Sequence, residues 1–204
     1  MKKIIALLFT AALIPLFLSG TALPDDTCDI ADQNKDGFRK ADVIWVPTPA
    51  AVIDRMLQMA SIKKGDVLYD LGCGDGRIVA AAAKKYGIKA WGFEIDPYLV
   101  DEARKLMKDE GVEHLATIER ADIFTLDLSK ASVITLYLLP ELNAKLLPQL
   151  AECRPGTRII AHDFGIPGTE PDRMVRMGGS IIYIWKTPLK GAKTRKVPGN
   201  KTGK

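Results

Sequence analysis

Residues 70–79 of this chain of 204 residues read DLGCGDGRIV, and this stretch decides the fold class. The short apolar run at 66–70 predicts a buried strand, and the alanine-rich run at 77–86 predicts a helix. Three alternating glycines lie in the turn between them: Gly72, Gly74 and Gly76. Because glycine has no Cβ, the backbone of such a turn can approach a ligand closely. We therefore expect a binding site at this strand-to-helix turn.

The remaining chain alternates between predicted strands and predicted helices. Thr48 and Pro49 predict the start of a helix, with Thr48 as its N-cap. Further strands are expected at 89–94, 116–119, 132–138 and 157–161, and further helices at 97–110 and 140–152. Gly178 and Gly179 separate two short strands, as in a β-hairpin. The order predicts an α/β fold, a doubly wound, mainly parallel, Rossmann-like seven-stranded sheet with a C-terminal antiparallel hairpin.

The residues around the glycine turn restrict the kind of ligand. In a doubly wound sheet, ligands bind beyond the carboxyl ends of the strands. A dinucleotide fingerprint needs a third glycine where this chain has Arg77, and Asp70 and Asp75 would repel a diphosphate. Glu94 ends the second strand of this unit, where a carboxylate can accept hydrogen bonds from ribose hydroxyls, and Asp122 follows the third strand. These residues favour a nucleoside ligand without phosphates.

Together, the turn at 70–76, Glu94 and Asp122 resemble the class I (seven-β-strand) S-adenosylmethionine-dependent methyltransferases. Three segments are similar to one subgroup, the lysine methyltransferases of the ATP synthase c-subunit and the adenine nucleotide translocase and their bacterial relatives. These segments are VPTP at 46–49, DLGCGDGRIV at 70–79 and GFEIDPYLV at 92–100. The resemblance extends roughly over residues 45–185, and it implies a methyltransferase that acts on a protein lysine.

The cofactor that the resemblance implies is S-adenosyl-L-methionine. Its expected binding residues are Asp70, Gly72, Gly74, Gly76, Glu94, Asp122 and Ile123. In the family pattern Asp70 serves the methionine ammonium group, Glu94 holds the ribose, and Asp122 with Ile123 borders the adenine. Trp45 either covers the cofactor or anchors the first helix in the core.

The acceptor side is expected after the fourth and fifth strands, at Tyr137 and His162. These are the candidate catalytic residues, Tyr137 as a wall of the acceptor channel and His162 as a base or a strand-end histidine. Many amino-methylating enzymes carry an Asn/Asp-Pro-Pro-aromatic tetrad here, and its absence argues against an adenine or glutamine amide acceptor. A small-molecule methyltransferase of the same fold and a non-catalytic S-adenosylmethionine-binding module are the alternatives to a protein lysine methyltransferase.

Charge is divided unevenly along the chain. The formal net charge is +4, but residues 1–22 and 186–204 hold nine Lys and Arg residues and no acid, which leaves −5 for residues 23–185. An acidic body argues against a nucleic-acid partner. Residues 188–204 predict a flexible basic tail, either solvated or in contact with an anionic membrane surface. We expect a monomer.

The amino end of the chain resembles an export signal. Lys2 and Lys3 precede an apolar run at 4–18, and small residues up to Ala22 form a cleavage site. A cleaved signal implies the periplasm or envelope, and the alternative is a membrane anchor formed by residues 4–18. The expected domains are therefore a signal or anchor at 1–22, a linker at 23–44, a methyltransferase domain at 45–187 and the tail at 188–204.

No metal site is expected. Residues 32–37 begin like an EF-hand calcium loop, but the twelfth position, which should supply a bidentate Glu, is Val43. The three cysteines, Cys28, Cys73 and Cys153, are widely spaced, so the chain has no Cys-x-x-Cys redox or zinc motif.

Overall fold

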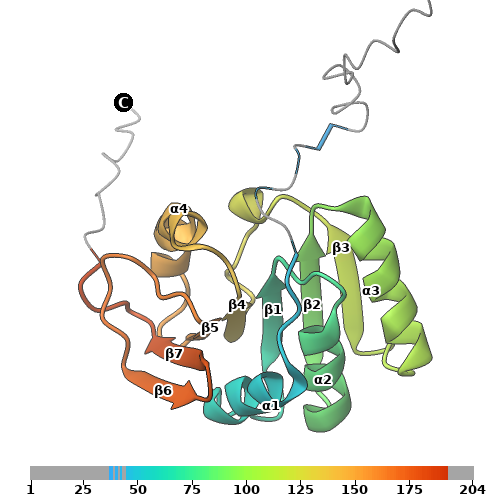
Figure 1. Cartoon of the computed structure of the whole chain (residues 1–204), viewed down its shortest axis with the longest axis horizontal. Coiled ribbons are helices and arrows are strands. Elements are labelled where there is room, and N and C mark those ends of the chain that lie inside the picture. The colour runs from blue at the N-terminus through green and yellow to red at the C-terminus, as the bar shows by residue number, and fades with distance from the viewer. Residues whose placement is uncertain (1–36, 39, 41, 43–44, 193–204) are drawn as a thin grey trace, which may run out of the picture. The chain divides into compact units, whose positions relative to one another are not determined.

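A seven-stranded sheet runs through the computed structural model, which describes residues 37, 38, 40, 42 and 45–192 (Figure 1). The strands in chain order are β1 (Val67–Leu71), β2 (Lys89–Glu94), β3 (Ala116–Arg120), β4 (Val133–Leu136), β5 (Arg158–His162), β6 (Arg173–Met177) and β7 (Ser180–Lys186). Their order in the sheet is β3-β2-β1-β4-β5-β7-β6. The first five strands pair in parallel, and β7 pairs antiparallel with β5 and β6. The predicted fold class is confirmed.

Helices cover both faces of this sheet. On one face, α1 (Ala50–Met59), α2 (Arg77–Tyr86) and α3 (Pro97–Asp109) share a buried apolar cluster with the strands. On the other face, α4 (Pro140–Ala151) and the short 3-10 helix η2 (Ile123–Thr125) share a second cluster. Because side chains alternate along a strand, Leu68 of β1 belongs to the first cluster and Tyr69 to the second. The sheet is therefore doubly wound.

Local sequence explains where α3 begins. Asp96 is its N-cap, and the carboxylate accepts a hydrogen bond from the Tyr98 backbone N at 2.8 Å. Pro97 occupies the first helical position, where a missing N–H is tolerated. The cap follows Glu94 by two residues, so it stops the chain from extending β2 and fixes the direction in which it leaves the sheet.

The start of α1 differs from the prediction. The helix begins at Ala50, Pro49 occupies the N-cap position, and no side chain caps the helix. The Thr48 hydroxyl instead lies 3.3 Å from Nδ1 of His162, at the end of β5. Thr48 is therefore used for a long-range contact, which competes with the local capping bond that the sequence predicts.

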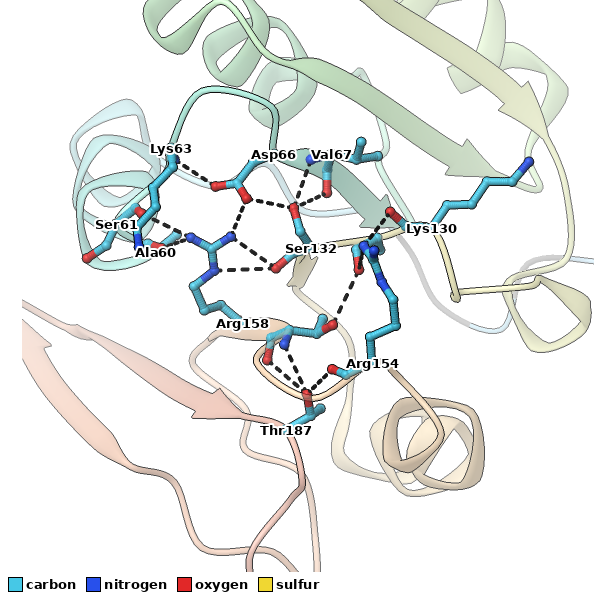
Figure 2. A network of polar contacts seen from close by, with 12 residues as sticks. Ala60, Ser61, Lys63, Asp66, Val67, Lys130, Ser132, Arg154, Arg158 and Thr187 are labelled. Atoms are coloured by element: carbon cyan, nitrogen blue, oxygen red, sulfur yellow. Dashed lines mark hydrogen bonds and ion pairs between the residues drawn. The ribbon is translucent and has the colours of Figure 1, made fainter.

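Polar contacts join the amino ends of the strands, at the edge opposite the glycine turn (Figure 2). The Arg158 guanidinium donates to Asp66 at 2.6 Å, and also to the carbonyl oxygens of Ala60, Ser61 and Ser132. Burial alone would raise the pKa of Asp66, but the hydrogen bonds from Arg158, the Lys63 backbone and Ser132 outweigh it and lower the pKa. This network connects the α1–β1 loop to β4 and β5.

The ordered fold continues slightly beyond the predicted domain boundary at 187. Lys190 forms an isolated β-bridge with Glu170 and an ion pair with Asp172 at 2.6 Å, and Leu189 is buried. Because of these contacts, residues 188–192 belong to the folded domain. The predicted signal or anchor at 1–22, most of the linker at 23–44 and the tail from 193 on lie outside the described residues. Among the described helices, none has the length and hydropathy needed to cross a membrane.

Candidate cofactor and acceptor site

A cleft lies at the carboxyl ends of β1, β2 and β4, where the order of the strands changes direction. Four of the predicted site residues line it together: Asp70, Gly72, Glu94 and Tyr137. The cleft has a volume of about 80 Å³, and Trp45 and Val46 close part of it. This is the position at which doubly wound sheets bind their ligands.

The glycine turn needs glycine for two separate reasons. Gly74 has a φ of +55° and Gly76 a φ of +79°, in the left-handed region that L side chains rarely adopt. A Cβ on Gly76 would lie 3.0 Å from both the Ala103 Cβ and the Met107 Cε of α3. The turn therefore combines a left-handed backbone with close contact to the neighbouring helix.

Glu94 holds the end of β2 against this turn. Its Oε2 accepts a hydrogen bond from the Gly74 N–H at 2.9 Å, and its Oε1 accepts from Ile95 N at 2.8 Å and Asp96 N at 3.1 Å. The side chain is buried. A carboxylate offers about four acceptor positions, and three are used here, so Glu94 can still accept one bond from a ribose hydroxyl.

Asp70 is a buried acid at the bottom of the cleft. Its Oδ1 accepts a hydrogen bond from the Thr135 hydroxyl at 2.6 Å. Burial raises the pKa of Asp70 to about 7, with smaller upward contributions from the charges of Glu94 and Asp75, while the Thr135 hydrogen bond acts in the opposite direction. Among the described residues Asp70 forms no ion pair with Lys or Arg. A ligand ammonium group would compensate its charge, so the site fits the amino-acid end of S-adenosylmethionine.

Arg77 fixes the segment that covers the turn. Its guanidinium pairs with Asp75, with Nε at 2.9 Å from Oδ1 and NH2 at 2.6 Å from Oδ2, and NH1 donates to the Thr48 carbonyl oxygen at 3.2 Å. The same guanidinium lies 5.8 Å from the centre of the Trp45 ring. Trp45 is 43% exposed, so it covers the glycine turn and is not a core anchor of α1.

Asp122 and Ile123 lie on the β3 side of the site. The Asp122 carboxylate accepts a hydrogen bond from Phe124 N at 3.0 Å and caps η2, and Ile123 is buried. The Ala121 N–H donates to the Glu94 carbonyl oxygen at 2.9 Å, which ties this segment to the expected ribose site. Neither Asp122 nor Ile123 lines the cleft, so their contact with adenine stays a prediction.

Tyr137 and His162 lie against each other on the acceptor side. Their ring centroids are 4.0 Å apart, and the Tyr137 ring lines the cleft. His162 is only 2% exposed: Nδ1 lies near Thr48, and Nε2 lies 3.0 Å from the Ser180 hydroxyl and 3.3 Å from Asp163 Oδ2. Burial lowers the pKa of His162, although Asp163 partly opposes this. The geometry favours a neutral histidine that supports Tyr137, and its predicted action as a base stays a prediction.

Two polar residues of the site were not singled out by the sequence patterns. Thr135 is fully buried in β4, where it is the one polar residue in the run Val-Ile-Thr-Leu. Asn143 is fully buried in α4 and donates hydrogen bonds to the loops beside Tyr137. A polar residue inside an apolar run could have indicated Thr135, and helical spacing from Leu146 and Leu150 could have indicated Asn143.

The donor groups of the cleft suit an organic ligand. Within the described residues, no three His, Cys, Asp or Glu side chains gather in an arrangement that could hold a metal ion. Cys73 and Cys153 are both buried free thiols. The cleft instead offers the carboxyl groups of Asp70 and Glu94, which fit an organic cation with hydroxyl groups.

Comparison with known proteins supports S-adenosylmethionine as the ligand. The family model of the ANTKMT methyltransferase domain matches residues 70–173. A protein-lysine N-methyltransferase of Saccharolobus islandicus (strain REY15A) is 42% identical over 137 residues, 66% of this chain and 85% of that protein. The lysine N-methyltransferase of the ATP synthase c-subunit from Homo sapiens is 34% identical over 149 residues, 72% of this chain and 62% of that protein.

Among solved structures, an RNA methyltransferase from Salinibacter ruber in complex with S-adenosyl-L-homocysteine is 50% identical to this chain. The superposition has a TM-score of 0.69 and includes 70% of this chain and 94% of the other. A methyltransferase from Thiobacillus denitrificans, also in complex with S-adenosyl-L-homocysteine, is 20% identical with a TM-score of 0.53 and agrees in fold.

Proposed function

The chain belongs to the ANTKMT methyltransferase family, and from this premise we propose that it methylates a lysine side chain of a protein. It is an S-adenosylmethionine-dependent methyltransferase of the Rossmann-like class. One observation carries the lysine proposal: Tyr137 forms an aromatic wall in the same cleft as the buried carboxyl groups of Asp70 and Glu94. Such a cleft suits a cationic cofactor on one side and an amine on the other.

The protein's contribution to the reaction is alignment and exclusion of water. When bound, S-adenosylmethionine would supply an electrophilic methyl group on a sulfonium, which would pass to the neutral form of the acceptor amine and leave S-adenosylhomocysteine. Asp70 binds the ammonium group and Glu94 the ribose, which fixes the methyl group relative to the Tyr137 wall. Burial and the charge of Asp163 raise the pKa of Tyr137, so its hydroxyl stays protonated near neutral pH. Tyr137 therefore orients the acceptor and does not take its proton.

The mouth of the cleft favours an apolar acceptor surface. Trp45 and Val46 line the cleft and are 43% and 51% exposed, and Leu139, two residues after Tyr137, is 42% exposed. Apolar side chains exposed beside a cleft are typical of a binding surface. They support a lysine flanked by apolar residues, as in a membrane protein. The names of relatives that act on the ATP synthase c-subunit agree with this proposal.

RNA is the second candidate acceptor, because the Salinibacter ruber relative is described as an RNA methyltransferase. The net charge of −5 over residues 23–185 opposes it, since proteins that bind nucleic acid carry positive charge. A small-molecule acceptor is the remaining alternative.

The proposed location is the periplasm or envelope, with a membrane anchor at residues 4–18 as the alternative. The proposal rests on the sequence of residues 1–22, which lie outside the described part of the chain. We also propose that the protein is a monomer and that its basic tail contacts anionic membranes. The mass of the amino end of the protein purified from membranes tests the location. A chain that begins near Leu23 excludes the anchor.

Transfer of a radiolabelled methyl group tests the acceptor. The full chain and its Asp70→Ala variant are incubated with labelled S-adenosylmethionine and an envelope fraction, and the products are digested with protease or ribonuclease. We expect label that resists ribonuclease and that elutes as methyl-lysine after acid hydrolysis, and none with the variant. Label that ribonuclease releases would contradict the lysine proposal, as would label confined to small molecules.

A further inference from the structure

The acceptor side of the cleft is built from two loops that no strand pairing holds together. The parallel pairing of β4 with β5 ends at Leu136 and Ala161. Residues 137–139 and 163–165 follow, and among the described residues no backbone hydrogen bond joins these two loops. Tyr137, in the first loop, nevertheless contacts the second: its ring lies against that of His162 at an interplanar angle of 39°, and it stacks on Phe164 with a centroid distance of 6.2 Å and an angle of 17°. Another group must therefore fix their separation.

The side chain of Asn143 is that group. It points from α4 into the space between the loops and is fully buried. Its Nδ2 donates to the carbonyl oxygens of Leu138 at 3.1 Å, Gly165 at 3.1 Å and Phe164 at 3.3 Å. Because three carbonyl oxygens surround this end of the amide, it must be the nitrogen end. One side chain thus holds the residues that follow Tyr137 and the backbone of Phe164.

The other end of the amide has no such contacts. Asn143 Oδ1 is buried and has no hydrogen-bond partner within the described structure. A buried acceptor without a partner destabilises a fold, and this offsets part of the stability that the hydrogen bonds of Nδ2 contribute. We propose that Asn143 is a positioning residue for methyl transfer, which sets the Tyr137–Phe164 wall at the distance that the acceptor needs. Its action on a lysine acceptor rests on the function proposed above.

Gln149 offers a matched control in the same helix. Its Nε2 donates to the carbonyl oxygens of Leu126 at 3.0 Å and Ile123 at 3.4 Å. It is therefore also an amide that clamps a loop to α4, but that loop lies on the Asp122 side of the fold. A general loosening of α4 would appear in variants of both amides, whereas a specific effect on the Tyr137 wall should appear only in variants of Asn143.

The test uses the full chain and its Asn143→Ala and Gln149→Ala variants. In Asn143→Ala, we expect kcat/KM for labelled transfer to envelope proteins to fall by about tenfold to a hundredfold, since small misplacements of reacting groups have such effects. Binding of S-adenosylhomocysteine, measured by calorimetry, should stay within about threefold, because Asp70 and Glu94 do not contact Asn143. A general loss of stability would lower both kcat/KM and cofactor affinity. A fall in kcat/KM alone would therefore indicate a positioning role for Asn143.

A second readout does not need an acceptor. The chain has five tyrosines, and the NMR resonance of the Tyr137 ring can be assigned with a Tyr137→Phe variant. In Asn143→Ala, this resonance should lose its ring-current shift and its ring should flip faster, while Gln149→Ala leaves it in place. If the parent transfers no methyl group to lysine, the proposed function fails and this measurement still decides the role of Asn143.

Three outcomes would overturn the proposal. The first is a folded Asn143→Ala protein with the parental Tyr137 resonance, and the second is a kcat/KM equal to that of the parent. Should Asn143→Ala not fold, Phe164→Leu provides the alternative, because it removes the outer ring of the stack and leaves the amide clamp intact. A parental kcat/KM in a folded Phe164→Leu protein is the third outcome, since it would show that the wall does not direct the acceptor.

Discussion

The indole ring of Trp45 lies directly on Gly74, at the centre of the glycine turn. A Cβ built on Gly74 would come within 2.1 Å of Trp45 Nε1. The covering segment and the turn therefore fit each other only because residue 74 has no side chain. Residue 45 precedes the first helix and residue 74 follows the first strand, so this contact joins two parts of the chain around the cofactor cleft.

Gly74→Ala should weaken both the fold and cofactor binding. The left-handed backbone alone should destabilise the variant by about 1 kcal/mol, and the contact with Trp45 should add about 1–3 kcal/mol. Gly87→Ala is the control, because Gly87 has a φ of +62° and open space around its Cβ position. Thermal unfolding and calorimetry with S-adenosylhomocysteine measure the two effects. An equal loss of stability in Gly74→Ala and Gly87→Ala would show that the Trp45 contact is unimportant. If the contact matters, adding Trp45→Ala to Gly74→Ala should restore part of the lost stability.

Cofactor binding should strengthen as the pH rises from 6 to 8. Asp70 has a pKa of about 7 in the protein without ligand, so it is mostly protonated at pH 6, and an ammonium ligand favours its ionised form. Binding of S-adenosylhomocysteine near pH 6.5 should therefore release protons, which calorimetry detects in buffers of different ionisation enthalpy. An affinity that is independent of pH in this range would contradict the assignment of Asp70 to the ammonium group.

Asp70→Asn should stabilise the empty protein at high pH. The pKa of Asp70 is about 7 when folded and 3.8 in its ordinary state, so its stabilising contribution is complete below about pH 4 and is lost as the pH rises through 7. At pH 8 the buried charge destabilises the protein by at most about 4 kcal/mol, and the amide removes it. Denaturant unfolding at pH 5 and pH 8 tests this. The variant should gain clearly more stability at pH 8 than at pH 5, and it should bind S-adenosylhomocysteine poorly at both.

The sequence was sufficient for the features that depend on neighbouring residues. The glycine spacing after an apolar strand predicted the position of Asp70 and the turn, and the Gly178–Gly179 pair predicted a hairpin in which Met177 opposes Ser180. These features follow from backbone conformation and side-chain period, which act over a few residues. The position of Glu94 beside the glycine turn was predicted because a parallel strand that pairs with β1 must end at the same edge of the sheet.

Contacts between distant residues were not predictable in this way. Thr48 was predicted as a helix cap, but its hydroxyl meets His162, 114 positions along the chain. Nothing near Asn143 indicates that its amide will join the loops after β4 and β5. Both contacts result from how the strands and helices pack in three dimensions, and a local pattern contains no information on that packing.

Glu94→Gln should weaken cofactor binding and also lower the stability of the fold, because both carboxylate oxygens accept backbone N–H bonds. The amide can still accept hydrogen bonds through one oxygen, but its NH₂ group cannot accept those that Glu94 receives from backbone N–H groups or from a ribose. Loss of hydrogen bonds to a charged group corresponds to about a tenfold to hundredfold weaker binding. Glu119→Gln is the control, because Glu119 is exposed on the adjacent strand β3. Equal affinities of the two variants for S-adenosylhomocysteine would exclude Glu94 from the ribose site.

Arg158→Ala should destabilise the fold by about 3 kcal/mol without changing the affinity for the cofactor. The change leaves the carboxylate of Asp66 without its partner, and breaking a largely buried ion pair has an effect of this size. The network lies at the amino ends of the strands, opposite the cleft, so S-adenosylhomocysteine should bind as in the parent (Figure 2).

The effect of Arg158→Ala should depend on pH. Because Arg158 lowers the pKa of Asp66, the stability that this ion pair contributes is present above about pH 4 and is lost as the pH falls through the lowered pKa. The free energy of unfolding, measured with denaturant, should therefore differ less between Arg158→Ala and the parent at pH 3 than at pH 7. Arg176→Ala is the control: Arg176 is exposed on β6, so this variant should be as stable as the parent at both pH values. An equal loss at both pH values would mean that Arg158 acts through the carbonyl oxygens and not through Asp66.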